Sequence, residues 1–145
     1  MIKVNSGVEE LQPFMKECQE NLHRHSETAM QETNSSKYVA ELLRDMGYNV
    51  HEGIGKTGMV ATMKVGDGDK NLGIRAEFDA LPIVEQNDLN YKSKIPDKAH
   101  LCGHDGHTAM LLGAAKYLAD RKSFHGILTL IFQPGEETMQ GSPLR

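Results

Sequence analysis

The chain has 145 residues, of which 39% are hydrophobic and 25% are charged, and its net charge is −4. This length favours one domain with one hydrophobic core. The acidic balance and the lack of a basic run argue against a nucleic-acid partner. No apolar run is long enough to cross a bilayer and the N-terminus has no secretory pattern, so we expect a cytoplasmic protein without a membrane partner.

Two helices are expected in the first third of the chain. Apolar residues recur with a helical period over 12–25, and the proline of this segment fits only the first turn of a helix. A second helical pattern covers 35–46, with Asn34 or Ser35 as its N-terminal cap and Gly47 directly after its last turn.

Three strands are expected next, at 48–51, 58–65 and 71–78. The sequence Gly-Asp-Gly-Asp at 66–69 predicts a hairpin that joins the second of these strands to the third. Residues 81–95 show no clear period and predict a long loop.

The pattern then returns to a helix and a strand. A helix is expected over 106–120, and the nearly continuous apolar run at 127–132 predicts a strand covered on both faces in a parallel or mixed sheet. Pro134 ends this strand. Helices that alternate with strands predict an α/β fold, in which a layered sheet is flanked by helices.

The stretch AHLCGHDGHT concentrates residue types that bind metals. Cys102 and His104 are two positions apart, so in an extended segment both point toward the same ion, and thiolate and imidazole suit zinc-like metals. The helix predicted after them should lower the pKa of Cys102. Asp105 has two interpretations, as the cap of that helix or as a carboxylate that orients a ligand imidazole. The other histidines, His100 and His107, are expected to be structural.

The two cysteines leave other interpretations open. A disulfide between Cys18 and Cys102 would be a single link and not a framework, and Cys18 lies in a helical pattern that indicates packing. Cys102 could instead be a nucleophile with a histidine as base. That hypothesis is the weakest, because it explains neither Glu136 nor Glu137.

Two acidic stretches follow predicted strands. Glu136 and Glu137 come directly after the last strand, and neighbouring carboxylates repel each other unless a cation is near. One carboxylate could bind a metal while the other takes a proton from water. Glu77 and Asp79 share one face at the end of an earlier strand. Taken alone, each stretch also fits a solvated acidic turn.

In this order, the stretches resemble peptidase family M20, and more narrowly its aminoacylase-like amidohydrolase branch. That branch includes hippurate hydrolases, auxin-conjugate hydrolases and N-acetyl-diaminopimelate deacetylases. The resemblance covers nearly the whole chain and rests on five stretches: HRHSE at 23–27, GKTG at 55–58, RAEFDALPI at 75–83, HLCGHDGHTA at 100–109 and IFQPGEE at 131–137.

The resemblance implies a zinc-exopeptidase-like catalytic domain that removes the acyl group from an N-acyl amino acid. It implies two divalent ions in a complete site, which could be zinc, manganese, cobalt or nickel. Cys102, His104 and Glu137 match metal ligands. Glu136 matches the general base, and Asp79 matches an acidic position beside the metals.

The chain departs from the family pattern at two positions. Glu77 stands where the family usually has aspartate, so we carry a site role only onto Asp79. Ser26 replaces a proline in the first stretch, so we assign no role to His23 or His25.

The resemblance also implies a length difference. We expect residues 1–145 to be the N-terminal part of a truncated catalytic domain, without the dimerisation domain, the remaining histidine ligands and the last strands. An open sheet edge, exposed apolar surface and no substantial activity of this chain alone should follow. The alternative is a non-catalytic homologue that keeps a partial metal site or acts with a partner chain. Full-length relatives are expected to be homo-oligomers.

Overall fold

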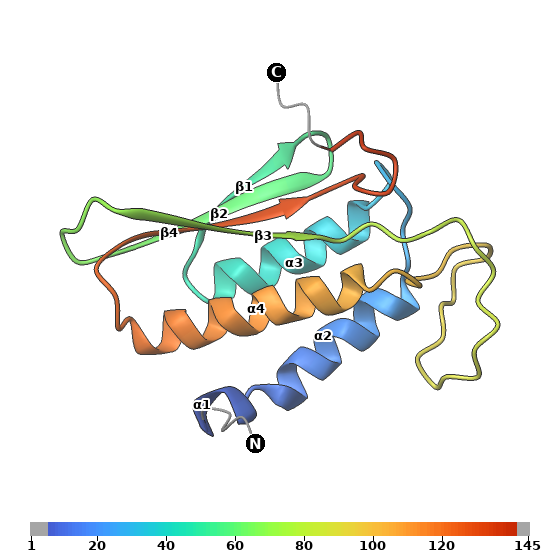
Figure 1. Cartoon of the computed structure of the whole chain (residues 1–145), viewed down its shortest axis with the longest axis horizontal. Coiled ribbons are helices and arrows are strands. Elements are labelled where there is room, and N and C mark those ends of the chain that lie inside the picture. The colour runs from blue at the N-terminus through green and yellow to red at the C-terminus, as the bar shows by residue number, and fades with distance from the viewer. Residues whose placement is uncertain (1–5, 142–145) are drawn as a thin grey trace.

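Four strands form one mixed sheet in the order β1-β2-β4-β3 (Figure 1). The computed structural model describes residues 6–141. The strands are β1 (Asn49–Ile54), β2 (Gly58–Val65), β3 (Asn71–Glu77) and β4 (Gly126–Gln133). The helices are α1 (Ser6–Glu9), α2 (Gln12–Arg24), α3 (Thr33–Asp45) and α4 (His104–Arg121).

The predicted hairpin at 66–69 is wrong. Strand β4 lies between β2 and β3, antiparallel to the first and parallel to the second, so residues 66–69 connect strands that are not neighbours. Turn residues specify only a local reversal of the chain. They say nothing about β4, whose apolar side chains favour a central position with partners on both sides. The hairpin of the sheet joins β1 to β2 instead.

The predicted α2 and α3 are confirmed, and Gly47 follows α3 with a positive φ of 89°. The predicted cap of α3 is wrong, because neither Asn34 nor Ser35 occupies the cap position. The carboxylate of Glu27 accepts hydrogen bonds from the backbone N–H groups of both residues. A side chain from the preceding loop therefore satisfies the free donors of this helix.

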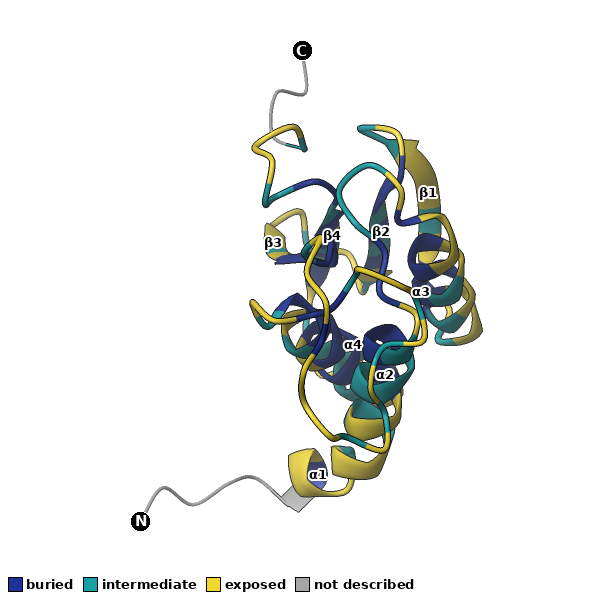
Figure 2. Cartoon of the chain, turned by 90° about the vertical axis from the view of Figure 1, so that its right-hand side faces the viewer, coloured by how far each residue is buried: buried dark blue, intermediate teal, exposed yellow. Residues whose placement is uncertain are grey.

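One face of the sheet holds the core. Helices α3 and α4 lie on this face and α2 packs against α4, so the described part of the chain has helices on one side of the sheet only (Figures 1 and 2). Burial alternates along β4, where Leu128 and Leu130 are buried and Ile131 is exposed. The predicted burial of β4 on both faces is therefore wrong. On β3, the apolar side chain of Leu72 is likewise exposed.

The long loop is confirmed, since residues 82–98 contain neither helix nor strand. Helix α4 begins at His104, two residues earlier than predicted. The residue before it, Gly103, has a φ of 114°, a left-handed conformation that favours glycine and turns the chain sharply into the helix. The predicted inert packing of Cys18 agrees with its burial, and Cys18 and the exposed Cys102 are both free. Within residues 6–141, no helix is long and apolar enough to cross a membrane.

Candidate metal centre

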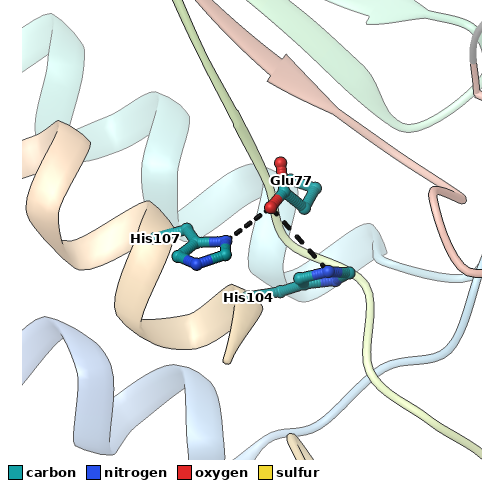
Figure 3. Close-up of side chains that lie close together, drawn as sticks. All are labelled: Glu77, His104 and His107. Carbon is teal, nitrogen blue, oxygen red and sulfur yellow. Dashed lines mark hydrogen bonds and ion pairs between the residues drawn. The ribbon is translucent and has the colours of Figure 1, made fainter. Parts of the chain in front are cut away.

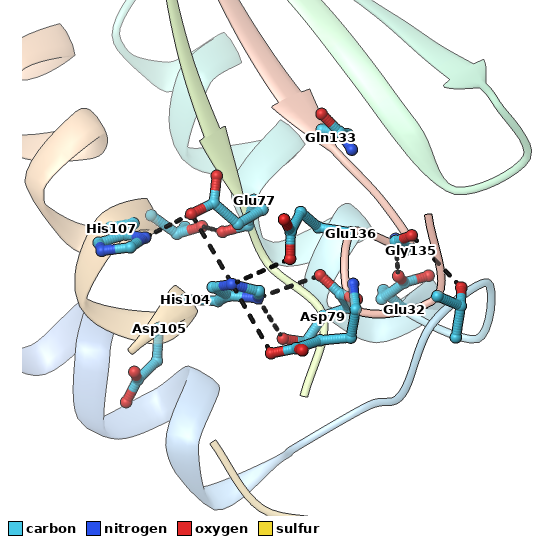
Figure 4. A network of polar contacts seen from close by, with 12 residues as sticks. Glu32, Glu77, Asp79, His104, Asp105, His107, Gln133, Gly135 and Glu136 are labelled. Atoms are coloured by element: carbon cyan, nitrogen blue, oxygen red, sulfur yellow. Dashed lines mark hydrogen bonds and ion pairs between the residues drawn. The ribbon is translucent and has the colours of Figure 1, made fainter. Parts of the chain in front are cut away.

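Three segments meet at one edge of the sheet (Figure 4). Strands β3 and β4 are parallel, so both end at this edge, with Glu77 paired to Gln133. Helix α4 is the crossover between them and begins at the same edge. This is the position at which open α/β sheets bind ligands. The fold therefore brings the acidic ends of β3 and β4 to the first turn of α4.

His104 stands at the centre of these groups and is almost fully buried. Its Nδ1 lies 2.9 Å from the backbone oxygen of Asp79 and 3.1 Å from Asp79 Oδ1. A carbonyl oxygen can only accept, so Nδ1 carries a hydrogen. The other nitrogen, Nε2, lies 3.6 Å from Glu136 Oε2 and 3.8 Å from Glu137 Oε1. It is therefore the ring atom that is available to a cation.

The side chain of Asp79 is hydrogen-bonded to two of the predicted site residues, His104 and Glu137. Its side chain is fully buried, and besides binding His104 it accepts a hydrogen bond of 2.9 Å from the backbone N–H of Glu137. Burial raises the pKa of Asp79, but the hydrogen bonds from His104 and Glu137 outweigh burial and leave the pKa lowered. An ionised carboxylate behind a ligand imidazole is the arrangement that orients histidine in metal sites.

Cys102, His104 and Glu137 offer one ligand atom each, and these atoms lie within 4.8 Å of one another. Glu137 Oε1 is buried and has no hydrogen-bond partner in the described part of the chain. A buried carboxylate oxygen without a partner is costly unless a cation is present. The donor set therefore fits a divalent ion, with one sulfur, one nitrogen and one oxygen ligand, as zinc accepts.

The charges around the donor group also favour a cation. Burial lowers the pKa of His104, but the hydrogen bonds and charge of Asp79, with Glu77, raise it to about 9. The Glu137 carboxylate is the main reason that the pKa of Cys102 is raised, followed by burial and the other surrounding carboxylates. The predicted lowering by the helix terminus is therefore wrong, because nearby full charges outweigh the partial charge of a helix. A divalent ion would counteract the repulsion between the Cys102 thiolate and the surrounding carboxylates.

Asp105 has neither of its predicted roles at this site. The cap position of α4 belongs to Gly103, and the Asp105 side chain points away from His104 (Figure 4). Its Oδ2 lies 2.8 Å from His23 Nδ1. Because Asp105 lies in the first turn of a helix that starts earlier than predicted, its side chain faces α2 and not the strand ends.

His23 and His100 are two further buried histidines, with ring centroids 6.2 Å apart. His23 is buried between two carboxylates, since its Nε2 is 3.0 Å from Glu85 Oε1. His100 was expected to be a satisfied structural residue, but it is buried with both ring nitrogens unpartnered among the described residues. Burial is the main reason that its pKa falls to about 4, so its ring is neutral near pH 7.

Two residues beside His104, Glu77 and His107, were given no site role from the sequence. Glu77 Oε1 lies 2.5 Å from His107 Nδ1 and 3.8 Å from His104 Nε2 (Figure 3). The sequence held a signal for the proximity of His104 and His107, because residues three positions apart on a helix share a face.

A third residue missed in the sequence is Glu32, which is fully buried. Its carboxylate accepts hydrogen bonds from the hydroxyl of Thr57, at 2.6 Å, and from the backbone N–H of Gly135, at 2.8 Å. It thus ties the turn before Glu136 to the β1–β2 turn. No local pattern identified Glu32, since its partners are distant in the sequence.

Known proteins are similar to this chain in sequence. Residues 73–144 match the model of peptidase family M20/M25/M40. The chain is 47% identical over 133 residues to hippurate hydrolase of Campylobacter jejuni and 41% identical over 137 residues to thermostable carboxypeptidase 1 of Saccharolobus solfataricus. These matches cover 92% and 93% of this chain but only 34% and 35% of the relatives.

A solved structure has the same fold over most of this chain. The YXEP protein of Bacillus subtilis, described as a dinuclear metal-binding peptidase from the M20 family, superposes with a TM-score of 0.83 at 34% identity. The match covers 89% of this chain and 36% of that protein. The α/β architecture with a mixed sheet is therefore that of M20 proteins, and this chain spans about a third of the length of its relatives. The chain belongs to peptidase family M20/M25/M40.

Proposed function

We propose that the chain supplies metal ligands and the general base of a hydrolase that cleaves the amide bond of N-acyl amino acids. The observation that supports this most directly is the convergence of Cys102, His104 and Glu137 within 4.8 Å, beside Glu136. The relatives named above are hydrolases, and one is named for hippurate, an N-acyl amino acid.

Each residue has a separate task in this proposal. A divalent ion, when bound, would polarise the amide carbonyl and lower the pKa of the attacking water. Asp79 holds the His104 ring with Nε2 toward the strand ends. Glu136 accepts the proton of the water and returns it to the amine that leaves. Its side chain is 42% exposed, compared with 23% for Glu137, so Glu136 is the freer of the two carboxylates to meet a substrate.

The number of metal ligands in this chain sets an expectation for the activity of residues 1–145 alone. Three protein ligands suffice for one catalytic zinc ion, whereas a pair of ions needs more. We therefore propose that residues 1–145 alone hydrolyse N-acyl amino acids poorly. Efficient metal-dependent release of glycine from hippurate by the purified chain would contradict this expectation.

A chimaera tests the proposed reaction. The corresponding segment of the Campylobacter hippurate hydrolase is replaced by this chain, and hippurate hydrolysis is measured with metal content. We expect an active chimaera in which Glu136→Gln lowers kcat by at least about 10²-fold, because general-base catalysis contributes this much. The metal content of the Glu136→Gln chimaera should equal that of the unmodified chimaera. Glu41→Gln, an exchange of an exposed helix residue, is the matched control. Turnover that survives Glu136→Gln would show that Glu136 is not the base.

A further inference from the structure

Beyond the proposed function, we propose that Glu77, His104 and His107 form a second divalent-metal site, which shares His104 with the Cys102 site (Figure 3). The ligand atoms of these three residues also lie within 4.8 Å of one another. One carboxylate oxygen and two imidazole nitrogens suit zinc, cobalt and related ions.

Two of these donors lie on one turn of a helix, and the third lies at the end of a strand. His104 and His107 are three residues apart in the first turn of α4, so their side chains share one face, and their ring centroids are 5.8 Å apart. Glu77 is the last residue of β3 and points at this face. Donors on a helix and a strand end are held more firmly than donors on a loop.

The second oxygen of Glu77 has its own partner. Arg75 Nη1 lies 3.2 Å from Glu77 Oε2, which leaves Oε1 directed at the two imidazoles. Oε1 lies 2.5 Å from His107 Nδ1, so the two donor atoms already face each other. An ion would bind both atoms in place of their direct contact.

The two sites exclude each other at His104. Its Nδ1 is held by Asp79, so Nε2 is the one ring atom left for a metal in either site. Nε2 lies 3.8 Å from both Glu77 Oε1 and Glu137 Oε1, so it is equally close to one carboxylate of each donor group. A single ion can therefore bind with Cys102 and Glu137 or with Glu77 and His107, but not with both pairs.

Solvent reaches the second site directly. A groove of about 370 Å³ runs between β3 and α4 and is lined by Glu77 and His107. The His107 side chain is 48% exposed, whereas that of His104 is 4% exposed. An ion can thus enter beside His107 without passing the Cys102 side.

Cobalt spectroscopy separates the two sites in the purified chain. Bound Co²⁺ gives a near-ultraviolet sulfur charge-transfer band only when a thiolate is a ligand. We expect Cys102→Ser to keep binding Co²⁺ without this band. Adding His107→Gln or Glu77→Gln to Cys102→Ser should weaken Co²⁺ binding at least about tenfold, since each removes a ligand. Adding His51→Gln, an exposed histidine of β1, should change nothing.

Circular dichroism and Zn²⁺ titration of each variant complete the test. Loss of all Co²⁺ binding in a folded Cys102→Ser chain would overturn the second site. So would unchanged affinity after His107→Gln and Glu77→Gln in that background. Two different exchanges are used because one of them could disturb the end of β3. Neither result would alter the proposed role of Cys102, because the band of the unmodified chain tests that role separately.

Discussion

Two buried histidines of this molecule, His23 and His104, are each surrounded by carboxylates, yet they are bonded differently. Both ring nitrogens of His23 have a carboxylate partner, Asp105 at 2.8 Å and Glu85 at 3.0 Å. His104 has one nitrogen bonded to Asp79, while the nearest carboxylate oxygens to the other are 3.6–3.8 Å away.

This difference distinguishes a structural histidine from a ligand. A ring with two carboxylate partners is held as a cation that links three segments, and it has no free atom. A ring with one partner has a fixed orientation and a free nitrogen. His23 therefore attaches the long loop, through Glu85, to α2 and α4, whereas His104 offers Nε2 to a metal.

The largest expected effect concerns stability. His23→Leu leaves the Glu85 and Asp105 carboxylates buried without their cation, and removing one partner of a buried pair costs about 3–5 kcal/mol. The free energy of unfolding, measured with urea, should fall by this amount. The Co²⁺ affinity of the folded protein should change little, because His23 contacts none of the metal donors.

His25→Leu is the matched control for that experiment. His25 lies two residues further along and is exposed. Its replacement should change stability far less. If both variants lost the same stability, the buried cluster around His23 would not be a structural link.

The next effect is on metal affinity. Asp79→Asn removes the charge that holds the His104 ring and that accepts the N–H of Glu137. Loss of such an orienting group weakens metal binding by about 10–100-fold. Isothermal titration with Zn²⁺ measures this, with Asp67→Asn as control because Asp67 is fully exposed. An Asp79→Asn chain that bound Zn²⁺ as tightly as the unmodified chain would refute the orienting role of Asp79.

A smaller effect is the pH dependence of the His23 cluster. Burial lowers the pKa of His23, but hydrogen bonds to Glu85 and Asp105 outweigh burial and raise it above 6.5. The stabilisation by protonated His23 is thus full below pH 6.5 and is lost as pH rises through the raised pKa. The pKa of Glu85 is lowered from 4.5 despite burial, mainly by the N–H of Ser93 and by His23, so its contribution is present above pH 4.5 and lost on acidification.

Urea denaturation at several pH values tests these signs. The stability difference between the unmodified chain and His23→Leu should be largest between pH 4.5 and 6.5 and should decrease at higher pH. His100 is present in both proteins, so its own titration largely cancels in the difference. A difference that grew from pH 6 to pH 9 would contradict a protonated His23.

Local patterns of the sequence predicted most elements and two residues of one donor group. Helix α2, helix α3 and strand β2 follow from their periods, and Cys102 and His104 follow from residue type and spacing. These features depend on neighbours in the chain. The ligand role of Glu137 was assigned by the family resemblance. Periodicity reports which face is apolar, and the family resemblance added the order of the motifs.

The errors concern features that depend on distant residues. Strand β4 lies between β2 and β3, and the turn residues at 66–69 do not encode this order. The role of Asp105 changed because α4 starts earlier and turns this side chain toward His23. Glu77 was given no site role because it departs from the family pattern, and His107 was expected to be structural. Their contact crosses from a strand to a helix, which no local pattern reports. Non-local packing decides such contacts, and propensity does not.

The most direct test of the account is a Co²⁺ titration of the purified chain and of His104→Gln, followed by the near-ultraviolet thiolate band. If Cys102, His104 and Glu137 bind one ion through His104 Nε2, the band saturates near one equivalent in the unmodified chain. It should be lost, or require at least about 100-fold more Co²⁺, in His104→Gln. A chain that bound Co²⁺ without the band, or a His104→Gln chain with unchanged affinity, would contradict the proposed metal centre.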